Sequence, residues 1–196
     1  MSSGKERDAG TLHPVDLLER EHRIIGAVLD AMDRQANQLS AGGSVPTDFW
    51  IQVANFMDEF TDLYHEGKEE KLLFRAIHSC GIPRQAGPIA AMSHEHVEGR
   101  ALSERLRSSA VHGRPEEVLR AARALSYLLR QHFAVEEDVL FKMARELLDD
   151  GQVAEILAGF SRLEREVAGE GGFGIYTEMA RRLCAESQVA FDSRWE

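Results

Sequence analysis

The sequence predicts an all-α protein, an up-down-up-down four-helix bundle with a C-terminal helical extension. Along four long segments, apolar residues recur at alternating spacings of three and four residues, which is typical of helices that pack in a bundle. Short connections rich in glycine and proline separate these segments, and short connections favour antiparallel neighbours. No segment shows the strict apolar/polar alternation of a half-buried strand.

The first helix is expected from Pro14 to about Ser40, because proline is well suited to the first turn of a helix. Its apolar stripe includes Leu18 and Ile25. His22 lies between them in the same helical phase, so we expect its imidazole to face the core.

The second helix should end at about Ser79, where a Cys-Gly-Ile-Pro sequence stops it. It is apolar around much of its circumference. One stripe passes through Phe60 and Leu63, and another passes through His65 and Glu69. We therefore expect this helix to be covered on two sides.

The third helix is expected over about Ile89–Val111, with His96 in phase with its apolar stripe. His94 and His96 are two residues apart, which places them about 200° apart around a helix. The two side chains cannot both face inward, and the phase assigns the inward position to His96.

The fourth helix is expected over about Glu116–Leu148, and its stripe includes His132, Glu136 and Val139. Two shorter helices should follow, near Val153–Val167 and near Tyr176–Ala185. We expect residues 14–148 to form the bundle and residues 149–196 to form an extension that packs on it.

Composition excludes several classes of protein. The formal net charge is -10 and the sequence has no block of basic residues, which argues against nucleic acid and against an anionic membrane as partners. The first residues lack the apolar stretch of an export signal, so we expect a cytoplasmic protein. Only two cysteines occur, and they are far apart, which argues against a thiolate metal site.

One motif of the form H-x3-E-E-x2-L-F occurs twice, at His65–Phe74 and at His132–Phe141. In a helix, residues i and i+4 lie on one face about 6 Å apart, so each His/Glu pair can hold one ion while its carboxylate bridges to a second. Two such pairs imply two ions. Imidazole and carboxylate donors suit iron, with manganese and zinc as alternatives.

A single histidine in a core is more often hydrogen-bonded than bound to metal, and an isolated H-x3-E pair is common on solvated faces. Four in-phase histidines, one on each long helix, are much harder to explain in that way. Two buried glutamates without partners would also be costly, and a pair of cations removes that cost. The predicted ligands are His22, His65, Glu69, His96, His132 and Glu136.

These residues and their neighbours resemble the hemerythrin-like, or HHE cation-binding, family. The resemblance rests on Glu21-His22, on both H-x3-E-E-x2-L-F motifs, and on the segment around His94-Glu95-His96, and it covers about residues 14–148. It implies a four-helix bundle around two iron ions with a bridging oxo or hydroxo group. The four histidines would be terminal ligands, and Glu69 and Glu136 would be the bridging carboxylates.

Two positions depart from the pattern of oxygen-carrying hemerythrins. Such a protein has a further histidine at the position of Arg100, so one iron here would have fewer imidazoles. Many members have a second histidine at the position of Glu66, a residue that is itself a ligand in some related domains. Glu137 competes with Glu136, because the family sometimes uses the residue at i+5, which requires a local distortion of the helix.

The function expected from this resemblance is binding or sensing of O2, nitric oxide or peroxide at a dinuclear non-haem iron centre. The alternative is a di-iron enzyme that decomposes peroxide or acts as an oxidase, with Tyr64 or Tyr176 close to the metals. Whether Glu66, Glu137, His94 or a tyrosine also binds metal stays open at the level of sequence, as do the oligomeric state and the choice between carrier, sensor and enzyme.

Overall fold

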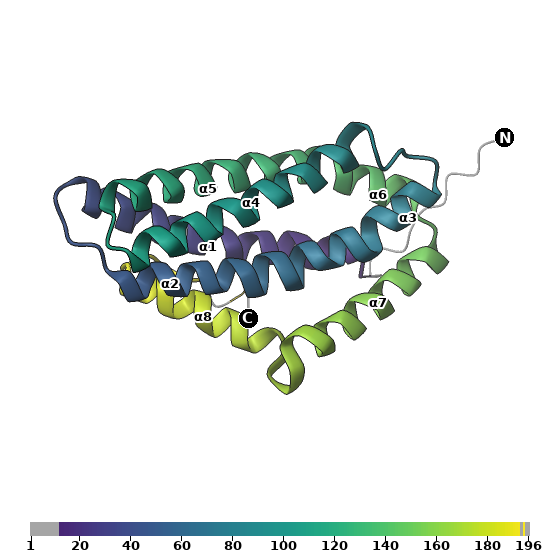
Figure 1. Ribbon diagram of the computed structural model, residues 1–196. Coiled ribbons are helices and arrows are strands. Elements are labelled where there is room, and N and C mark those ends of the chain that lie inside the picture. Colours follow the sequence, from purple (N-terminus) through teal and green to yellow (C-terminus); the bar gives the residue numbers. More distant parts are fainter. Residues whose placement is uncertain (1–11, 193, 195–196) are drawn as a thin grey trace.

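A computed structural model describes residues 12–192 and 194, and all regular secondary structure in those residues is helical. Figure 1 shows the long helical segments side by side, with α7 and α8 along one side of them. The expectation that the first residues lack an export signal concerns residues 1–11, which lie outside the described part of the chain. The elements are α1 (Pro14–Ser40), α2 (Thr47–Phe56), η1 (Met57–Glu66), η2 (Glu69–Leu73), α3 (Phe74–Ser79), α4 (Gly87–Val111), α5 (Pro115–Val135), η3 (Glu136–Leu140), α6 (Phe141–Leu147), α7 (Asp150–Ala168), η4 (Gly169–Gly171) and α8 (Gly172–Glu186).

Helix α1 begins and ends at the residues predicted from the sequence. Its N-cap is His13, whose Nδ1 accepts a hydrogen bond from the Val15 N–H, while the Asp16 carboxylate accepts one from the His13 N–H. These two bonds satisfy backbone donors that the first turn of a helix otherwise leaves free. The apolar stripes predicted for α1 and α4 are buried along their length.

Three segments are π-helical, a feature that the periodicity did not predict. η1 and η2 lie in the second long helical stretch, and η3 lies in the fourth. A π turn contains an extra residue and therefore shifts the phase of the side chains that follow. Because of this shift, two predicted core positions are wrong. The stripe members Leu63 and Val139 are 51% and 41% exposed, whereas their neighbours Tyr64 and Leu140 are buried.

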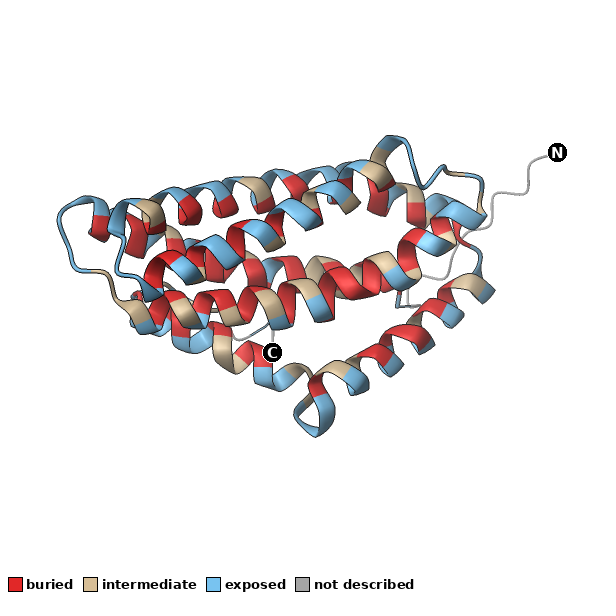
Figure 2. Cartoon of the chain, viewed as in Figure 1, coloured by how far each residue is buried: buried red, intermediate tan, exposed pale blue. Residues whose placement is uncertain are grey.

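Apolar residues form two core clusters, one toward each end of the long helices. Figure 2 shows buried residues lining the faces of the long helices that look toward one another. Along α1, Leu18 belongs to one cluster and Ile25 to the other. His22 therefore lies in the zone between the two clusters, where the core is polar.

The C-terminal helices pack against the rest of the chain through apolar side chains. Helix α8 contacts α1 and α2, and its Tyr176 and Leu183 belong to the larger core cluster. Helix α7 contacts η1 and η2. At Gly159 of α7, a β-carbon would lie only 2.7 Å from Cδ2 of Leu72, so glycine permits this close approach. None of the helices in the described residues is long and apolar enough to cross a membrane.

Candidate metal centre

Four helical segments each direct one histidine into the polar zone of the core. His22 comes from α1, His65 from η1, His96 from α4 and His132 from α5, and each is at most 4% exposed. His94 is exposed, so His96 is the inward member of the pair, as the helical phase predicted. All six residues predicted as ligands lie together in the zone between the two apolar clusters.

The six side chains form two overlapping sets of four, and the donor atoms of each set lie within 4.8 Å of one another. The first set contains His22 and His65, and the second contains His96 and His132. Both sets contain Glu69 and Glu136. Two neighbouring cations could therefore share both carboxylates while each takes two imidazoles of its own.

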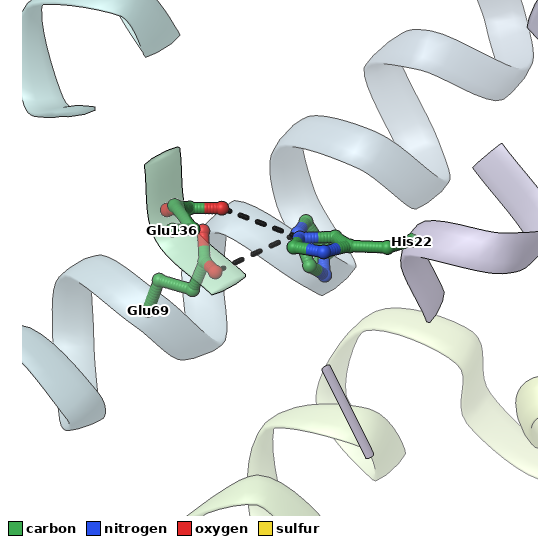
Figure 3. Close-up of side chains that lie close together, drawn as sticks. His22, Glu69 and Glu136 are labelled. Carbon is green, nitrogen blue, oxygen red and sulfur yellow. Dashed lines mark ion pairs between the residues drawn. The ribbon is translucent and has the colours of Figure 1, made fainter. Parts of the chain in front are cut away.

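The carboxylates face histidines of both sets. Oε1 of Glu69 is 3.6 Å from Nε2 of His65, and its Oε2 is 3.4 Å from Nε2 of His96. Oε2 of Glu136 is 3.2 Å from Nε2 of His22 and 3.3 Å from Nε2 of His132. Figure 3 shows the Glu69 and Glu136 carboxylates on the side that faces the His22 ring.

Buried polar atoms without hydrogen bonds gather at this place. Nε2 of His22, Nε2 of His65 and all four carboxylate oxygens of Glu69 and Glu136 are buried and make no hydrogen bond. Such atoms are rare in folded proteins, because burial without a partner is costly. Lone pairs on nitrogen and oxygen that converge in this way are the donors that divalent and trivalent iron, manganese and zinc accept. The residues present therefore fit a pair of metal cations.

On the far side of each ring, Nδ1 contacts a second carboxylate at 2.8–2.9 Å. Metal-binding histidines are commonly oriented in this way, because the outer carboxylate fixes the ring and leaves the other nitrogen for the ion. These outer carboxylates were not predicted, although Glu137 was weighed as a ligand. The four pairs are His22 with Glu137, His65 with Glu21, His96 with Glu70, and His132 with Glu95.

The same arrangement occurs once in each half of the chain. In both H-x3-E-E motifs the first glutamate faces the histidine cluster. The second glutamate contacts Nδ1 of a histidine in the other half of the chain: Glu70 contacts His96, and Glu137 contacts His22. In both Glu-His pairs, the glutamate holds the histidine of the motif that follows it in the chain. The π segments η2 and η3 begin at the first glutamate of their motif, Glu69 and Glu136. The repeated sequence is therefore a repeated structure.

The profile of the hemerythrin HHE cation binding domain matches residues 13–144, a range that contains every residue of this cluster. The chain belongs to the hemerythrin HHE cation-binding family. Relatives of this hemerythrin-family chain include uncharacterized proteins of Mycobacterium tuberculosis and Mycobacterium bovis. Each is 23% identical over 174 residues, which is 86% of this chain and 67% of the relative. No solved structure matches the chain.

Beside His96, this hemerythrin-family site has a cation where oxygen carriers have an imidazole. Nη1 of Arg100 lies 2.8 Å from Oδ1 of Asp62 and 3.2 Å from Oε2 of Glu66. The same Glu66 oxygen is 3.9 Å from Nδ1 of His96. With His96 and Glu70, Glu66 forms a third group of close donor atoms. Glu66 thus belongs to the side of the centre that holds His96 and His132.

The two tyrosines weighed as redox partners lie in an aromatic cluster between η1 and the C-terminal helix α8. Tyr64 and Tyr176 have ring centroids 5.2 Å apart, and both pack on Phe60. Burial and the nearby carboxylates of Glu21 and Glu164 raise the pKa of Tyr64 far above its usual range.

Charges within the cluster control the protonation of its histidines when no metal is bound. Burial lowers the pKa of His22, but the nearby carboxylates of Glu136 and Glu137 outweigh burial and raise the pKa to about 9. Burial also lowers the pKa of His96, but contacts with Glu69 and Glu70 outweigh burial and raise the pKa to about 11. Burial also raises the pKa of the Glu66 carboxyl to about 8.

Metal affinity should therefore rise with pH. At pH 7 the metal-free protein holds protons on His22 and His96, because their pKa values lie above 7. A cation binds only neutral imidazole, so loading releases protons, and affinity should increase about tenfold per pH unit for each proton released. Titration with Zn²⁺ at pH 6, 7 and 8, with proton release followed in weak buffer, measures this. Equal affinity at all three pH values would contradict it.

Proposed function

We propose that this chain holds two iron ions and binds O2, nitric oxide or peroxide at them. The observation that carries the proposal is the pair of overlapping donor sets that share Glu69 and Glu136, in which both carboxylates and the Nε2 atoms of His22 and His65 are buried without hydrogen bonds. His22 and His65 would bind one ion, and His96 and His132 would bind the other. Iron at these positions would supply a redox-active centre that takes a small ligand.

The side of the centre next to Arg100 is the proposed place of ligand entry. A small pocket with room for about one water molecule is lined by Thr61, Glu66, Gly99, Arg100 and Leu129. Gly99 lies one helical turn from His96, and Leu129 lies one turn from His132. The guanidinium of Arg100, whose Nη1 is held by Asp62 and Glu66, could donate a further hydrogen bond to an oxygen of a ligand bound there.

The same proposal includes the architecture around the centre. We infer that residues 14–148 form an up-down-up-down four-helix bundle, and that residues 149–196 form an extension packing on it. Contacts of α1 with α5, of α4 with α5 and of α2 with α4 support this arrangement, as do the contacts of α8 with α1 and α2. The centre lies where all four long stretches contribute one histidine.

Anaerobic reconstitution with Fe²⁺ tests the function. We expect two iron ions per chain by metal analysis and, after exposure to air, the near-ultraviolet absorption of a diferric centre together with stoichiometric uptake of O2. Exposure to nitric oxide should give a distinct spectrum in the ferrous protein. A protein that binds no iron, or that shows no spectral change with any of the three ligands, would contradict the proposal.

The competing function is catalytic, and the same preparation distinguishes it. Steady turnover of hydrogen peroxide that is lost in His65→Ala would identify an enzyme, whereas binding without turnover would identify a sensor or carrier. His65 is fully buried and faces both Glu69 and Glu21, so its loss removes a donor without altering the surface. Circular dichroism of the variant checks that the helices remain.

A further inference from the structure

A lysine is completely buried beside the metal centre. Nζ of Lys68 lies 2.5 Å from Oε1 of Glu21 and 2.7 Å from Oε1 of Glu164, and it lies 3.7 Å from the centroid of the Tyr64 ring. Oε2 of the same Glu21 carboxylate is 2.9 Å from Nδ1 of His65. A continuous chain of contacts therefore runs from His65 through Glu21 and Lys68 to Glu164 on α7.

Among the described residues, the other half of the site has no buried cation at the corresponding place. The residue that precedes Glu136, and so corresponds to Lys68, is Val135, which is 40% exposed. The carboxylate that corresponds to Glu21 is Glu95, which contacts Nδ1 of His132 at 2.9 Å and is itself 31% exposed. Lys68 thus breaks a correspondence that the histidines and their carboxylates otherwise keep.

Burying a lysine is costly, and its ion pairs in a protein interior commonly do no more than offset the loss of hydration. A stabilising role alone is therefore a weak explanation for the burial of Lys68. The position of Lys68 beside Glu21 suggests a second explanation. A carboxylate that accepts a hydrogen bond from a histidine makes that histidine a stronger metal ligand. When the carboxylate is shared with an ammonium group, this effect is weakened, and the ammonium charge also repels a nearby cation.

We propose that Lys68, held by Glu164, is a positioning residue that makes the two metal positions unequal by weakening the one formed by His22 and His65. This inference rests on the proposed function, because it requires that both positions bind metal. The second position has a weaker counterpart of this cation. Nη1 of Arg100 lies 3.6 Å from the Glu70 oxygen that contacts His96, but the Arg100 side chain is 36% exposed, so solvent screens its charge more than that of buried Lys68.

Helix α7 thereby takes part in the metal centre. Glu164 is the member of the chain of contacts that reaches the surface, with 32% of its side chain exposed. If Glu164 loses its charge, Lys68 interacts with Glu21 alone and draws that carboxylate further from His65. If Lys68 loses its charge, the Glu21 carboxylate interacts with His65 alone. The two changes should therefore shift metal binding at this position in opposite directions.

Iron release to a chelator tests the inference in the full-length protein loaded anaerobically with Fe²⁺. Wild type should lose its iron in two phases of one ion each, and His65→Ala should lack the faster phase. Lys68→Met should slow the faster phase about ten- to a hundredfold, the size of effect that outer ligands have on metal affinity. Glu164→Gln should accelerate it, and Glu166→Gln, which changes an exposed residue of the same helix, should leave it unchanged.

Opposite effects of Lys68→Met and Glu164→Gln distinguish tuning from damage, because a loosened fold would accelerate release in both variants. Glu164→Gln replaces a partly exposed side chain, so its result decides the matter even where Lys68→Met does not fold. Release from Glu164→Gln at the wild-type rate would overturn the inference. A wild-type chain that binds no iron would instead overturn the proposed function.

Discussion

Replacing Glu136 by glutamine is expected to empty both metal positions. The Glu136 carboxylate faces His22 of one donor set and His132 of the other, at 3.2 and 3.3 Å. Glutamine keeps the shape of the side chain but loses the charge that two neighbouring cations would share. We expect the affinity for both ions to fall by at least about 100-fold, beyond the range found when only an outer partner of a ligand is lost. Metal content after dialysis at a fixed free-metal concentration measures this.

The neighbouring glutamate provides a graded comparison. Of the four histidines, Glu137 contacts His22, at Nδ1, so Glu137→Gln should weaken one position, by about ten- to a hundredfold, and spare the other. Glu146→Gln, at an exposed site on α6, should change neither. A Glu136→Gln variant that retains both ions at wild-type affinity would show that Glu136 is not shared between them.

Removing the metal is expected to lower the thermal stability strongly. A ligand at about 100 times its Kd stabilises the folded state by about 2.7 kcal/mol, so two ions contribute about 5 kcal/mol. For a chain of this size, that corresponds to a decrease in Tm of about 10–20 °C. The physical origin is the group of buried donor atoms on His22, His65, Glu69 and Glu136 that make no hydrogen bond without metal. Differential scanning calorimetry with and without chelator measures the difference.

The Glu136→Gln variant supplies the control for that measurement. Because it should bind no metal, chelator should not change its Tm. If wild type also melts at the same temperature with and without chelator, the chain is a metal-free helical protein and the cluster has another purpose. An increase in Tm on adding Zn²⁺ to the metal-free wild type would confirm that the loss is reversible.

Regular apolar spacing made the first and third long helices predictable. α1 begins and ends where the sequence placed it, and the same regular phase assigned His22 and His96 to the interior. The second and fourth stretches were predicted as helices, and their phase correctly assigned His65, Glu69, His132 and Glu136 to the interior, but it failed at Leu63 and Val139. The π segments add a residue to a turn, which apolar spacing does not reveal, so Leu63 and Val139 were misplaced.

The six predicted ligands come together in the structure, and their binding of metal stays a prediction. The outer carboxylates could have been found from the sequence, because a glutamate precedes His22 and His96, and a second glutamate follows Glu69 and Glu136. The proposed role of Lys68 could not have been found from the sequence. A lysine among Gly, Glu and Glu gives every indication of a solvated face, and only the packing of α7 over it reveals that it is buried.

Each half of the chain carries a complete set of parts: a Glu-His pair on one helix and an H-x3-E-E motif on the next. Two copies of a single helical hairpin would thus contain every donor of the centre. A homodimer built in that way would have to repeat each residue on both sides of its axis. Joining the halves in one polypeptide allows them to differ, and the contrast between buried Lys68 and exposed Val135 is a difference that two identical copies could not encode.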